Sequence, residues 1–468
     1  MKLNDILQSS NVDIEVSGIS YNSRETKPGD VFVAITGFKT DGHKYAKSAV
    51  ANGAVCVVCE RELEDIDVPC VIVENSRRAL AEMSCNFYGN PTSKLKLIGV
   101  TGTNGKTTVT YLVKSILEAN GEKVGLMGTN KNMIGNRDYY TERTTPESLE
   151  MQQFFADMVK EGCTYGVMEV SSHSLDLYRV YGCDYHVGAF TNLTQDHLDF
   201  HGDMDNYYLA KSKLFDMCKT GVINADDSYG ERLISDCNCN KISYGIDNGD
   251  MVAENIEYGD RGVKFDCGNM KINLGIPGVF SVYNALTAIG ICKACGISDE
   301  VIEKALSVAQ GVKGRAEVVD CGRDFTLLID YAHTPDGLEN ILESVRNFAR
   351  GRVVVLFGCG GDRDKTKRPK MGKVAGRLAD FCIVTSDNPR TEEPDAIIRD
   401  ILEGMSEAMA EYVVIENRRD AIEYAIRHAR KDDVIVLAGK GHEDYQILKD
   451  KTIHFDEREV IRDILSKM

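Results

Sequence analysis

Residues 99–108, GVTGTNGKTT, have the composition and order of a phosphate-binding loop. Glycines and small residues between an apolar run and a helical pattern let several backbone N–H groups point at one anion, and the first turn of the helix adds a partial positive charge. Lys106 could then reach the terminal phosphates of a nucleotide, and the Thr107 hydroxyl could ligate Mg²⁺. The strict pattern requires glycine where this chain has Val100, so a plain tight turn is the alternative.

Two further strand-like runs end in side chains that could hold a cation. Glu169 closes one run in VMEVSSH, and His197 follows another in TNLTQDHLDFH. Because α/β sheets bind ligands beyond the carboxyl ends of their strands, these groups favour a hard cation near the phosphates. His197 and His201 have the spacing of a zinc protease motif, but no glutamate follows His197, so that interpretation fails. The alternative for each histidine is a hydrogen-bonded structural role. From residue chemistry alone, we expect Lys211 to be a solvated lysine on a helix.

Parallel strands must position these groups. Apolar runs typical of strands alternate with helical patterns, such as the one at 109–117, almost throughout the chain. The strand-like runs are DVFVAI, AVCVVC, CVIVE, KLIGVTG, YGVMEV, VGAFTN, GVINAD, FTLLIDYAH, RVVVLFG, FCIVTSD and DVIVLAG. This alternation is typical of parallel α/β sheets covered on both faces. With breakers in YGNPTSK and QGVKGRAE, it predicts three α/β domains, at 1–93, 94–313 and 314–468.

Composition excludes several classes of protein. A net charge of −17 over 468 residues argues against a general nucleic-acid binder, which needs a basic face. No apolar run approaches the length of a membrane span, and the start MKLNDILQSSNVDIEV does not resemble a signal peptide. Of the 15 cysteines, many lie in apolar runs, which favours buried free thiols in a reducing cytoplasm. A zinc site at the two CxxC pairs is the alternative.

Taken together, these motifs resemble the Mur ligase family over nearly the whole chain. The motifs, in the family's order, are GTNGKTT, MEVSSH, NLTQDHLDFH, AKSKLF, PGVFSVYNALTA, GRAE, DYAHTPDGL, GCGGDRD, DNPR and GKGHEDYQ. The family's own ATP loop lacks the first glycine, which accounts for Val100. The resemblance implies a UDP-sugar-binding N-terminal domain, a central P-loop ATPase domain and a Rossmann-like C-terminal domain that binds an amino acid.

The resemblance also implies a reaction. ATP phosphorylates a substrate carboxylate to an acyl phosphate, an amine attacks it, and an amide, ADP and phosphate result. The motifs are most similar to the branch of the family that adds the third residue of the peptidoglycan stem peptide. The implied substrates are UDP-N-acetylmuramoyl-L-alanyl-D-glutamate and meso-2,6-diaminopimelate, with ATP and Mg²⁺. We expect a cytoplasmic monomer with no nucleic-acid partner and no membrane insertion.

The implied ATP and metal sites draw on several motifs. ATP would be bound by Gly102, Thr103, Asn104, Gly105, Lys106, Thr107, Thr108, Asn284, Arg315, Asp330 and His333. Mg²⁺ would be held by Thr107, Glu169, His197 and Lys211. In the family the lysine of AKxxLF is carbamylated, so Lys211 would be N6-carboxylysine, an anion that can lie beside a metal. Lys106, Glu169, His197 and Lys211 would form the catalytic set, and domain closure would assemble it.

The implied nucleotide-sugar site lies on the first domain and extends into the second. Its uridine-binding turn is GISYNSR, followed by the loop GFKTDGH. The contacting residues would be Tyr21, Ser23, Thr144, Thr145, Ser171 and Arg179. A guanidinium suits an anionic partner because it pairs bidentately. Many relatives carry glutamine two residues before this arginine, where the chain has Leu177, which puts one polar contact in question.

The implied amino-acid site is formed by TSDNPRTEEP and its neighbours. Its residues would be Arg363, Asp387, Asn388, Pro389, Arg390, Gly439 and Glu443. Arg390 would meet the distal carboxylate of diaminopimelate, which L-lysine lacks, and a buried unpaired arginine would penalise lysine. The alternative for Arg390 is a turn residue with a solvated side chain.

Four other functions remain open. A lysine-adding sister enzyme is opposed by Arg390. A folylpolyglutamate-synthase-like ligase shares the ATP loop, but we would not expect the uridine-type first domain or DNPR. A regulatory P-loop ATPase would need no amino-acid pocket. A nucleotide-sugar-binding protein without activity would not need the metal ligands or Lys211.

Overall fold

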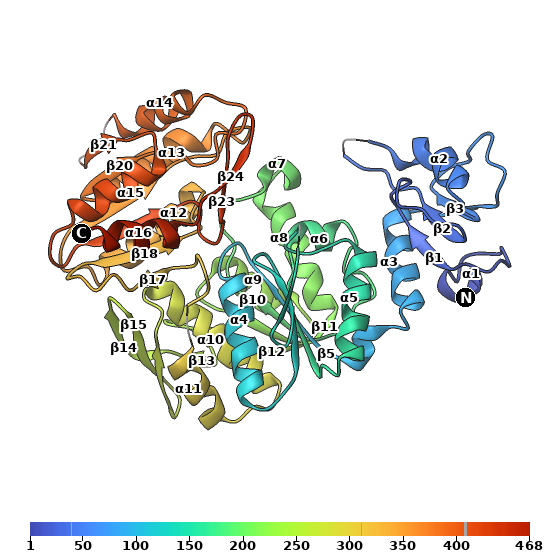
Figure 1. Ribbon diagram of the computed structural model, residues 1–468. Helices are drawn as coiled ribbons and strands as arrows, with labels where there is room; N and C mark the ends of the chain where they lie inside the picture. The colour runs from blue at the N-terminus through green and yellow to red at the C-terminus, as the bar shows by residue number, and fades with distance from the viewer. Residues whose placement is uncertain (39, 142, 310, 407–409) are drawn as a thin grey trace. The chain divides into compact units, whose positions relative to one another are not determined.

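The chain is described from a computed structural model that covers residues 1–38, 40–141, 143–309, 311–406 and 410–468 (Figure 1). It divides into two compact units. The first comprises Met1–Gly102, Leu117–Ile223 and Asp227–Ile242, and the second comprises Thr103–Ile116, Asn224–Asp226 and Ser243–Met468. Lys39 of GFKTDGH and Gln310 of QGVKGRAE lie outside the described residues.

The first 90 residues contain a parallel sheet of order β1-β2-β3-β4. Its strands are β1 (Gly18–Ser20), β2 (Asp30–Val33), β3 (Cys56–Cys59) and β4 (Cys70–Ile72). The helices here are α1 (Leu3–Ile6), α2 (Ala46–Ala51) and α3 (Ser76–Phe87), with a 3-10 turn η1 (Gly42–Tyr45), and a second 3-10 turn, η2 (Pro91–Lys94), follows. Because β2 and β3 are buried at every position, their runs of apolar residues are those of a strand covered on both faces. The strands predicted from DVFVAI, AVCVVC and CVIVE are confirmed.

A nine-stranded sheet of order β13-β12-β11-β10-β5-β9-β6-β7-β8 follows. Its strands are β5 (Lys96–Thr101), β6 (Val124–Met127), β7 (Asn132–Ile134), β8 (Arg137–Tyr139), β9 (Tyr165–Glu169), β10 (Tyr185–Phe190), β11 (Cys218–Asn224), β12 (Asn240–Gly245) and β13 (Met251–Val252). The central pairs, among them β5–β9 and β5–β10, are parallel, whereas β7 and β8 add an antiparallel edge. The carboxyl ends of β5, β9 and β10 therefore lie at one edge, as the sequence predicts.

Helices connect these strands. They are α4 (Lys106–Ala119), α5 (Ser148–Lys160), α6 (Ser172–Asp176), α7 (Leu198–His201), α8 (Met204–Ser212) and α9 (Ser228–Asp236), with a 3-10 turn η3 (Lys213–Asp216). Two further helices, α10 (Val279–Ala294) and α11 (Asp299–Val308), come later in the chain. The helix predicted at 109–117 is confirmed as α4.

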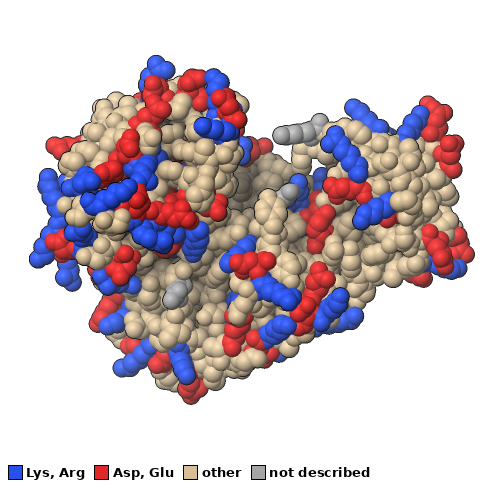
Figure 2. Space-filling model, in the orientation of Figure 1, with Lys and Arg blue, Asp and Glu red and all other residues tan. Residues whose placement is uncertain are grey.

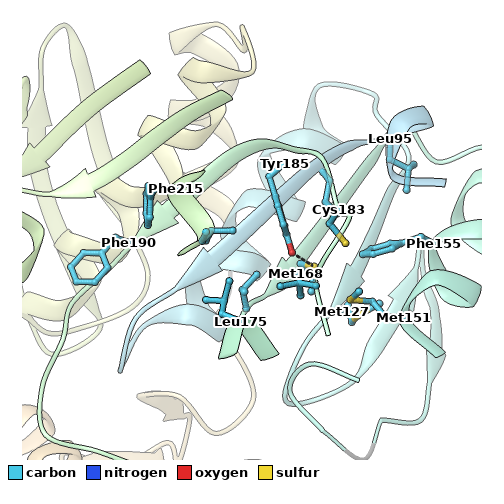
Figure 3. Packing of buried hydrophobic residues seen from close by; sticks show 14 of the residues in the cluster. Leu95, Met127, Met151, Phe155, Met168, Leu175, Cys183, Tyr185, Phe190 and Phe215 are labelled. Atoms are coloured by element: carbon cyan, nitrogen blue, oxygen red, sulfur yellow. Dashed lines mark hydrogen bonds between the residues drawn. The ribbon is translucent and has the colours of Figure 1, made fainter. Parts of the chain in front are cut away.

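One hydrophobic core of the first unit lies beside β9 and β10 (Figure 3). The Tyr185 hydroxyl donates to Met168 Sδ at 3.3 Å, and Phe155 from α5 is also fully buried. A Cβ at Gly99 would lie 2.7 Å from the Tyr185 ring, so this core requires glycine in the middle of β5. Close packing against β5 therefore constrains the strand that leads into the GVTGTNGKTT loop.

Two all-antiparallel segments lie in the second unit. One is the sheet β14 (Glu254–Gly259), β15 (Gly262–Cys267) and β16 (Met270–Leu274). The other is the hairpin of β23 (Tyr445–Ile447) and β24 (Thr452–His454). Side chains alternate between buried and exposed along β16, which is typical of a sheet with one solvated face.

Residues 317–438 contain a six-stranded sheet of order β17-β18-β22-β19-β20-β21. Its strands are β17 (Glu317–Val319), β18 (Thr326–Asp330), β19 (Val353–Phe357), β20 (Phe381–Val384), β21 (Glu411–Val414) and β22 (Val434–Ala438). All neighbours are parallel except β17–β18. The helices are α12 (Pro335–Arg346), α13 (Lys367–Leu378), α14 (Pro394–Met405), α15 (Arg418–Arg427) and α16 (Glu457–Ser466). The predicted α/β class is confirmed.

The surface carries charges of both signs. Figure 2 shows lysine and arginine side chains interspersed with aspartate and glutamate on the face in view. Among the described residues, no helix is both long enough and apolar enough to cross a membrane. All 15 cysteines are free thiols that are buried or half-buried, so the prediction of free thiols is confirmed.

Candidate active site

The phosphate-loop motif joins β5 to α4. Gly102 has φ +147°, and a Cβ there would lie 1.9 Å from Thr191 Oγ1, so any side chain is excluded. Lys106, which belongs to the second unit, is the first residue of α4. Its Nζ donates to the Thr103 carbonyl at 2.8 Å. Thr107 is buried in the first helical turn, where helix N–H groups lack intrahelical partners. This strand–turn–helix is the local context that the phosphate-binding prediction requires. Asn104, Gly105 and Thr108 complete the motif.

Lys211 is buried on α8 and is only 2% exposed. Its Nζ donates to the Gly102 carbonyl at 2.9 Å and lies 4.7 Å from the centre of the Tyr207 ring. The interpretation from the residues alone, a solvated helical lysine, is therefore wrong. The structure places this lysine at the turn after β5.

Glu169 ends β9 and is 1% exposed. Its Oε1 accepts from Thr129 N at 2.8 Å, and its Oε2 accepts from Thr129 Oγ1 at 2.9 Å. Thr129 Oγ1 is also 3.0 Å from Thr144 Oγ1, and Thr145 Oγ1 donates to the Glu169 carbonyl at 2.8 Å. A hydrogen-bonded network therefore orients Glu169 beside two residues predicted to bind the nucleotide-sugar substrate.

His197 precedes α7 with a left-handed φ of +54°. Its ring is 4.9 Å from that of His173, and its Nε2 is 3.4 Å from Asp196 Oδ2. Burial, together with the imidazoles of His197 and His201, lowers the pKa of His173 to about 4. His201 forms a hydrogen bond through Nε2 with Ser172 Oγ at 2.9 Å, which is the structural alternative weighed for the histidines.

The proposed Mg²⁺ ligands mix several side-chain types. In the described part of the chain, no three His, Cys, Asp or Glu side chains are grouped so as to hold a metal by themselves. The predicted set contains only two such residues, Glu169 and His197, and is completed by Thr107 and Lys211. Its oxygen-rich donors suit Mg²⁺ if Lys211 carries a carboxylate.

Arg179 lies within an ion-pair cluster in the first unit. Its Nη1 donates to the Thr145 carbonyl at 3.2 Å, and its Nε is 3.4 Å from Glu147 Oε2. The same Glu147 oxygen accepts from Arg77 Nη1 at 3.3 Å. Burial lowers the pKa of Arg179. The two guanidiniums around one carboxylate form a partly buried cationic patch suited to an anion.

The remaining residues of the predicted nucleotide-sugar site are also engaged. The Tyr21 hydroxyl donates to Glu150 Oε1 at 2.8 Å, and Ser23 is buried in the first domain. Ser171 caps α6, since its Oγ accepts from Ser174 N at 3.2 Å. Leu177 follows the end of the same helix. The structure therefore gives Ser171 a local structural role besides the predicted contact.

Tyr331 is the centre of a second group of predicted residues. The Arg315 guanidinium lies 4.8 Å from the centre of its ring, and the His333 and His442 rings lie at 4.6 and 4.9 Å. Asp330 accepts from the backbone N–H groups of residues 316 and 332, and burial raises the pKa of its carboxyl. The structure thus brings together three residues predicted to contact ATP. Asn284 is buried separately, on α10.

The predicted amino-acid residues lie on the loops after β19, β20 and β22. Arg390 has a left-handed φ of +53°, and its Nη1 donates to the Gly361 carbonyl at 2.9 Å. Gly361 N donates to the Asn388 carbonyl at 2.9 Å, and Thr391 Oγ1 donates to Asp362 Oδ1 at 2.7 Å. The two loops are therefore fastened along their length. Arg363 is exposed on the first loop, and Asp387 and Pro389 are buried on the second.

A side-chain contact joins the second loop to the third. Asn388 Nδ2 donates to Glu443 Oε2 at 2.9 Å. Gly439, with φ +116°, donates its N–H to the Asp330 carbonyl at 3.0 Å. This backbone contact connects the predicted amino-acid loop to the end of β18.

Sequence reasoning missed several residues of this region. Lys440 and Arg368 are both fully buried charges beneath these loops, and His442 packs on Tyr331. Lys440 and His442 lie in the quoted motif GKGHEDYQ, which was the only signal available for them. Arg368 lies outside the quoted motifs, on a helix where an arginine is ordinarily solvated.

Family models match most of the chain. The model described as the Mur ligase middle domain matches residues 100–292, and the Mur ligase, glutamate ligase domain matches residues 314–441. A third, the Mur ligase family catalytic domain, matches residues 15–88.

Curated relatives match over the full length. A UDP-N-acetylmuramoyl-L-alanyl-D-glutamate–2,6-diaminopimelate ligase from Clostridium botulinum is 53% identical, with 100% of both chains covered. An enzyme of the same name from Caldanaerobacter subterraneus is 53% identical over 100% of this chain and 99% of its own. A solved structure of a ligase of this name has a TM-score of 0.72 at 30% identity, over 100% of this chain and 99% of its own.

Proposed function

Because the chain belongs to the Mur ligase family and is an ATP-dependent, amide-bond-forming ligase of three-domain α/β architecture, we propose the following reaction for it. It joins meso-2,6-diaminopimelate to UDP-N-acetylmuramoyl-L-alanyl-D-glutamate through an acyl phosphate, releasing ADP and phosphate. The reaction is a step of peptidoglycan precursor synthesis. The relatives named for this activity, 53% identical over their whole length, support the proposal.

The observation that carries the choice of amino acid is the placement of Arg390. The Arg390 guanidinium donates to the Gly361 carbonyl and to the carbonyl of Asn388, which lies on the same loop as Arg390. A carboxylate partner would gain a charged hydrogen bond of about 1.5–3 kcal/mol. L-lysine lacks the distal carboxylate and would leave the guanidinium without that partner, so the site favours diaminopimelate.

ATP would be bound by the GVTGTNGKTT loop. A carboxylate that attacks a phosphate meets strong charge repulsion, which Lys106 would reduce at the terminal phosphate. Mg²⁺, held by Thr107, Glu169, His197 and carbamylated Lys211, would supply further charge neutralisation. Carbamylation needs a neutral, partly desolvated amine, and Lys211 is buried. Thr129 orients Glu169 for this role through both carboxylate oxygens.

The nucleotide-sugar substrate would lie along the first unit. The cationic patch of Arg77 and Arg179 would pair with an anionic group of this substrate. That group would replace part of the contact that the two arginines make with Glu147. Tyr21 and Ser23 would contact the uridine, with Thr144, Thr145 and Ser171 nearer the sugar and peptide. Leu177 cannot supply the polar contact that a glutamine would make.

The base and ribose of ATP would meet the Tyr331 group. Arg315 and His333 lie beside the Tyr331 ring in the second unit, and Asp330 precedes Tyr331 in the chain. Asn284 would add an amide contact. The domain boundaries 1–93, 94–313 and 314–468 belong to this proposal, as does domain closure during the reaction.

The proposed location is the cytoplasm, where ATP and nucleotide sugars are supplied. We propose that the protein is a monomer. Size-exclusion chromatography with light scattering measures the oligomeric state directly.

One assay tests the reaction. Phosphate release is measured with ATP, Mg²⁺ and UDP-N-acetylmuramoyl-L-alanyl-D-glutamate, with meso-diaminopimelate or L-lysine added in parallel. Release with diaminopimelate alone supports the full proposal. Release with lysine retains the ligase and overturns the choice of amino acid. Release that needs neither amino acid overturns the ligase reaction and indicates a simple ATPase.

A further inference from the structure

We propose that Lys440 is a positioning residue that fixes Asn388 and Glu443 in the geometry needed to bind the amino-acid substrate. The inference rests on the proposed function and concerns a residue outside the predicted substrate contacts. Lys440 follows β22 and is completely buried. Because a charged side chain is almost never fully buried without compensation, its partners indicate what it does.

Four oxygen atoms surround the Lys440 ammonium. Nζ donates to the Tyr445 carbonyl at 2.8 Å, to Asn388 Oδ1 at 3.1 Å and to Glu443 Oε2 at 3.2 Å. It also lies 3.2 Å from Asp387 Oδ1. An ammonium has only three N–H donors, so the three hydrogen bonds use all of them. Lys440 therefore retains no donor for a substrate and acts only through its neighbours.

These partners come from separate parts of the chain. Asp387 and Asn388 lie on the loop after β20, Glu443 on the loop after β22, and Tyr445 begins the hairpin strand β23. One buried charge thus joins two strand-end loops and a hairpin. Loops carry binding residues but are inherently more mobile than strands, so such a junction is needed for a defined binding geometry.

The Asn388 amide is oriented by the same contacts. Its Oδ1 accepts from Lys440 Nζ and from Ile447 N at 2.9 Å, and its Nδ2 donates to Glu443 Oε2. These partners allow one orientation of the amide, since the exchanged orientation would place NH₂ against two donors. Asn388 is therefore a link between Lys440 and Glu443 as well as a predicted substrate contact.

Glu443 is the group through which this network reaches the substrate. Both Lys440 and Asn388 donate to Oε2, and among the described residues no hydrogen bond to Oε1 is seen. The side chain is 13% exposed, whereas that of Lys440 is fully buried. With Oε2 occupied, Oε1 is directed to accept from the substrate ammonium. A preoriented carboxylate binds an ammonium without first losing its own rotational freedom.

The test compares Lys440→Met with the wild type. Methionine keeps the length of the side chain and removes the charge and all three donors. We expect the KM for diaminopimelate to rise roughly tenfold or more, as for the loss of a hydrogen bond to a charged group. The KM values for ATP and for the nucleotide-sugar substrate should stay within about twofold, because the predicted contacts of those two substrates include neither Lys440 nor its hydrogen-bond partners. Lys440→Gln, which keeps a donor, should show a smaller rise and serves if Lys440→Met is insoluble.

The matched control is Arg352→Met. Arg352 Nη2 pairs with the buried carboxylate of Asp433 at 2.6 Å, just before β22, whereas Lys440 follows that strand. The control therefore breaks an ion pair with a buried carboxylate. This ion pair lies at the end of the sheet opposite to Lys440. It should lower the melting temperature without changing the KM for diaminopimelate. A purely structural role for Lys440 predicts the same behaviour in both variants, which would overturn the proposal.

A double variant tests the route through Glu443. If Lys440 acts by orienting that carboxylate, Lys440→Met should add little to Glu443→Gln, and the effects on KM should be far from multiplicative. Multiplicative effects would overturn the proposal. Its failure is distinguishable from failure of the proposed function, because the latter appears in the wild type as phosphate release that diaminopimelate does not stimulate.

Discussion

The Arg368 guanidinium holds the Glu392 carboxylate in a two-pronged contact beneath the loop that carries Arg390. Arg368 Nη2 donates to Glu392 Oε1 at 2.8 Å and Nη1 donates to Oε2 at 3.1 Å, while the arginine side chain is only 1% exposed. Glu392 Oε1 also accepts from Asp362 N at 2.7 Å. The same carboxylate thus fastens the Arg390 loop to the loop after β19.

Replacing Arg368 with methionine should destabilise the protein. The change leaves Glu392 and Asp400 without their shared partner, and breaking a buried ion pair costs about 3–5 kcal/mol. Because Asp400 is more than a third exposed, we expect the lower end, about 3 kcal/mol. Urea unfolding measures the loss. Arg377→Met, on the same helix and in an exposed pair with Glu339, is the control and should change stability by less than about 1 kcal/mol. Equal losses would contradict the buried-pair argument.

Acid should weaken the Glu392 contact in a defined pH range. Hydrogen bonds from Arg368 and from Asp362 N lower the pKa of Glu392 to about 2, against about 4.3 in an unfolded chain. Since the folded pKa is the lower one, its stabilising contribution is complete above about pH 4.3 and is lost as pH falls through about 2. Urea midpoints between pH 2.5 and 5 should fall more steeply in the wild type than in Glu392→Gln. Parallel curves would show that this carboxylate does not contribute.

Removal of the Arg390 side chain should change the choice of amino acid. We expect Arg390→Met to reduce kcat/KM for diaminopimelate roughly 10- to 150-fold, as for the loss of a charged hydrogen bond. Any activity with L-lysine should fall less, because lysine has no distal carboxylate to lose. Arg399→Met, exposed on α14, is the control and should match the wild type. An unchanged ratio between the two amino acids would assign Arg390 to the turn alone.

Thr129 should affect the catalytic rate and the Mg²⁺ requirement through its contacts with Glu169. Valine at this position removes the donor to Glu169 Oε2 at nearly constant volume, while the backbone N–H contact to Oε1 remains. We expect a lower kcat and a higher Mg²⁺ concentration for half-maximal rate, by about tenfold. Thr164→Val removes a similar contact with Glu122 just before the same strand and should leave both quantities unchanged. A matched loss in the two variants would mean that general stability, not the orientation of Glu169, is affected.

Lys211 should be essential as a carboxylate carrier. Alanine at this position should abolish most activity, and a short carboxylic acid such as propionate should restore part of it by supplying the missing anion. ¹³C-bicarbonate labelling of the wild type should show a carbamate carbon that is absent from Lys211→Ala. Full activity of wild-type protein depleted of CO₂, with no carbamate signal, would exclude the modification.

Local sequence patterns predicted eleven of the strands and the helix after the GVTGTNGKTT loop. The strand before GVTGTNGKTT, the helix after it and the strands ending near Glu169 and His197 were predictable, because apolar runs and glycine breakers act over a few residues. The antiparallel strands β14–β16 were not predicted. Their alternating exposed residues carry less of the apolar signal by which the buried strands were recognised.

The chemistry of the site was predictable in its residue types, whereas their mutual orientation was decided by tertiary structure. Glu169 and Thr129 are 40 residues apart, and Lys440 and Asn388 are 52 apart, so no local pattern relates them. The local sequence does not distinguish Arg368 and Lys440 from ordinary surface charges, because only the packing of the folded chain buries them. Buried charges then need partners, and only the folded chain brings distant loops close enough to provide those partners.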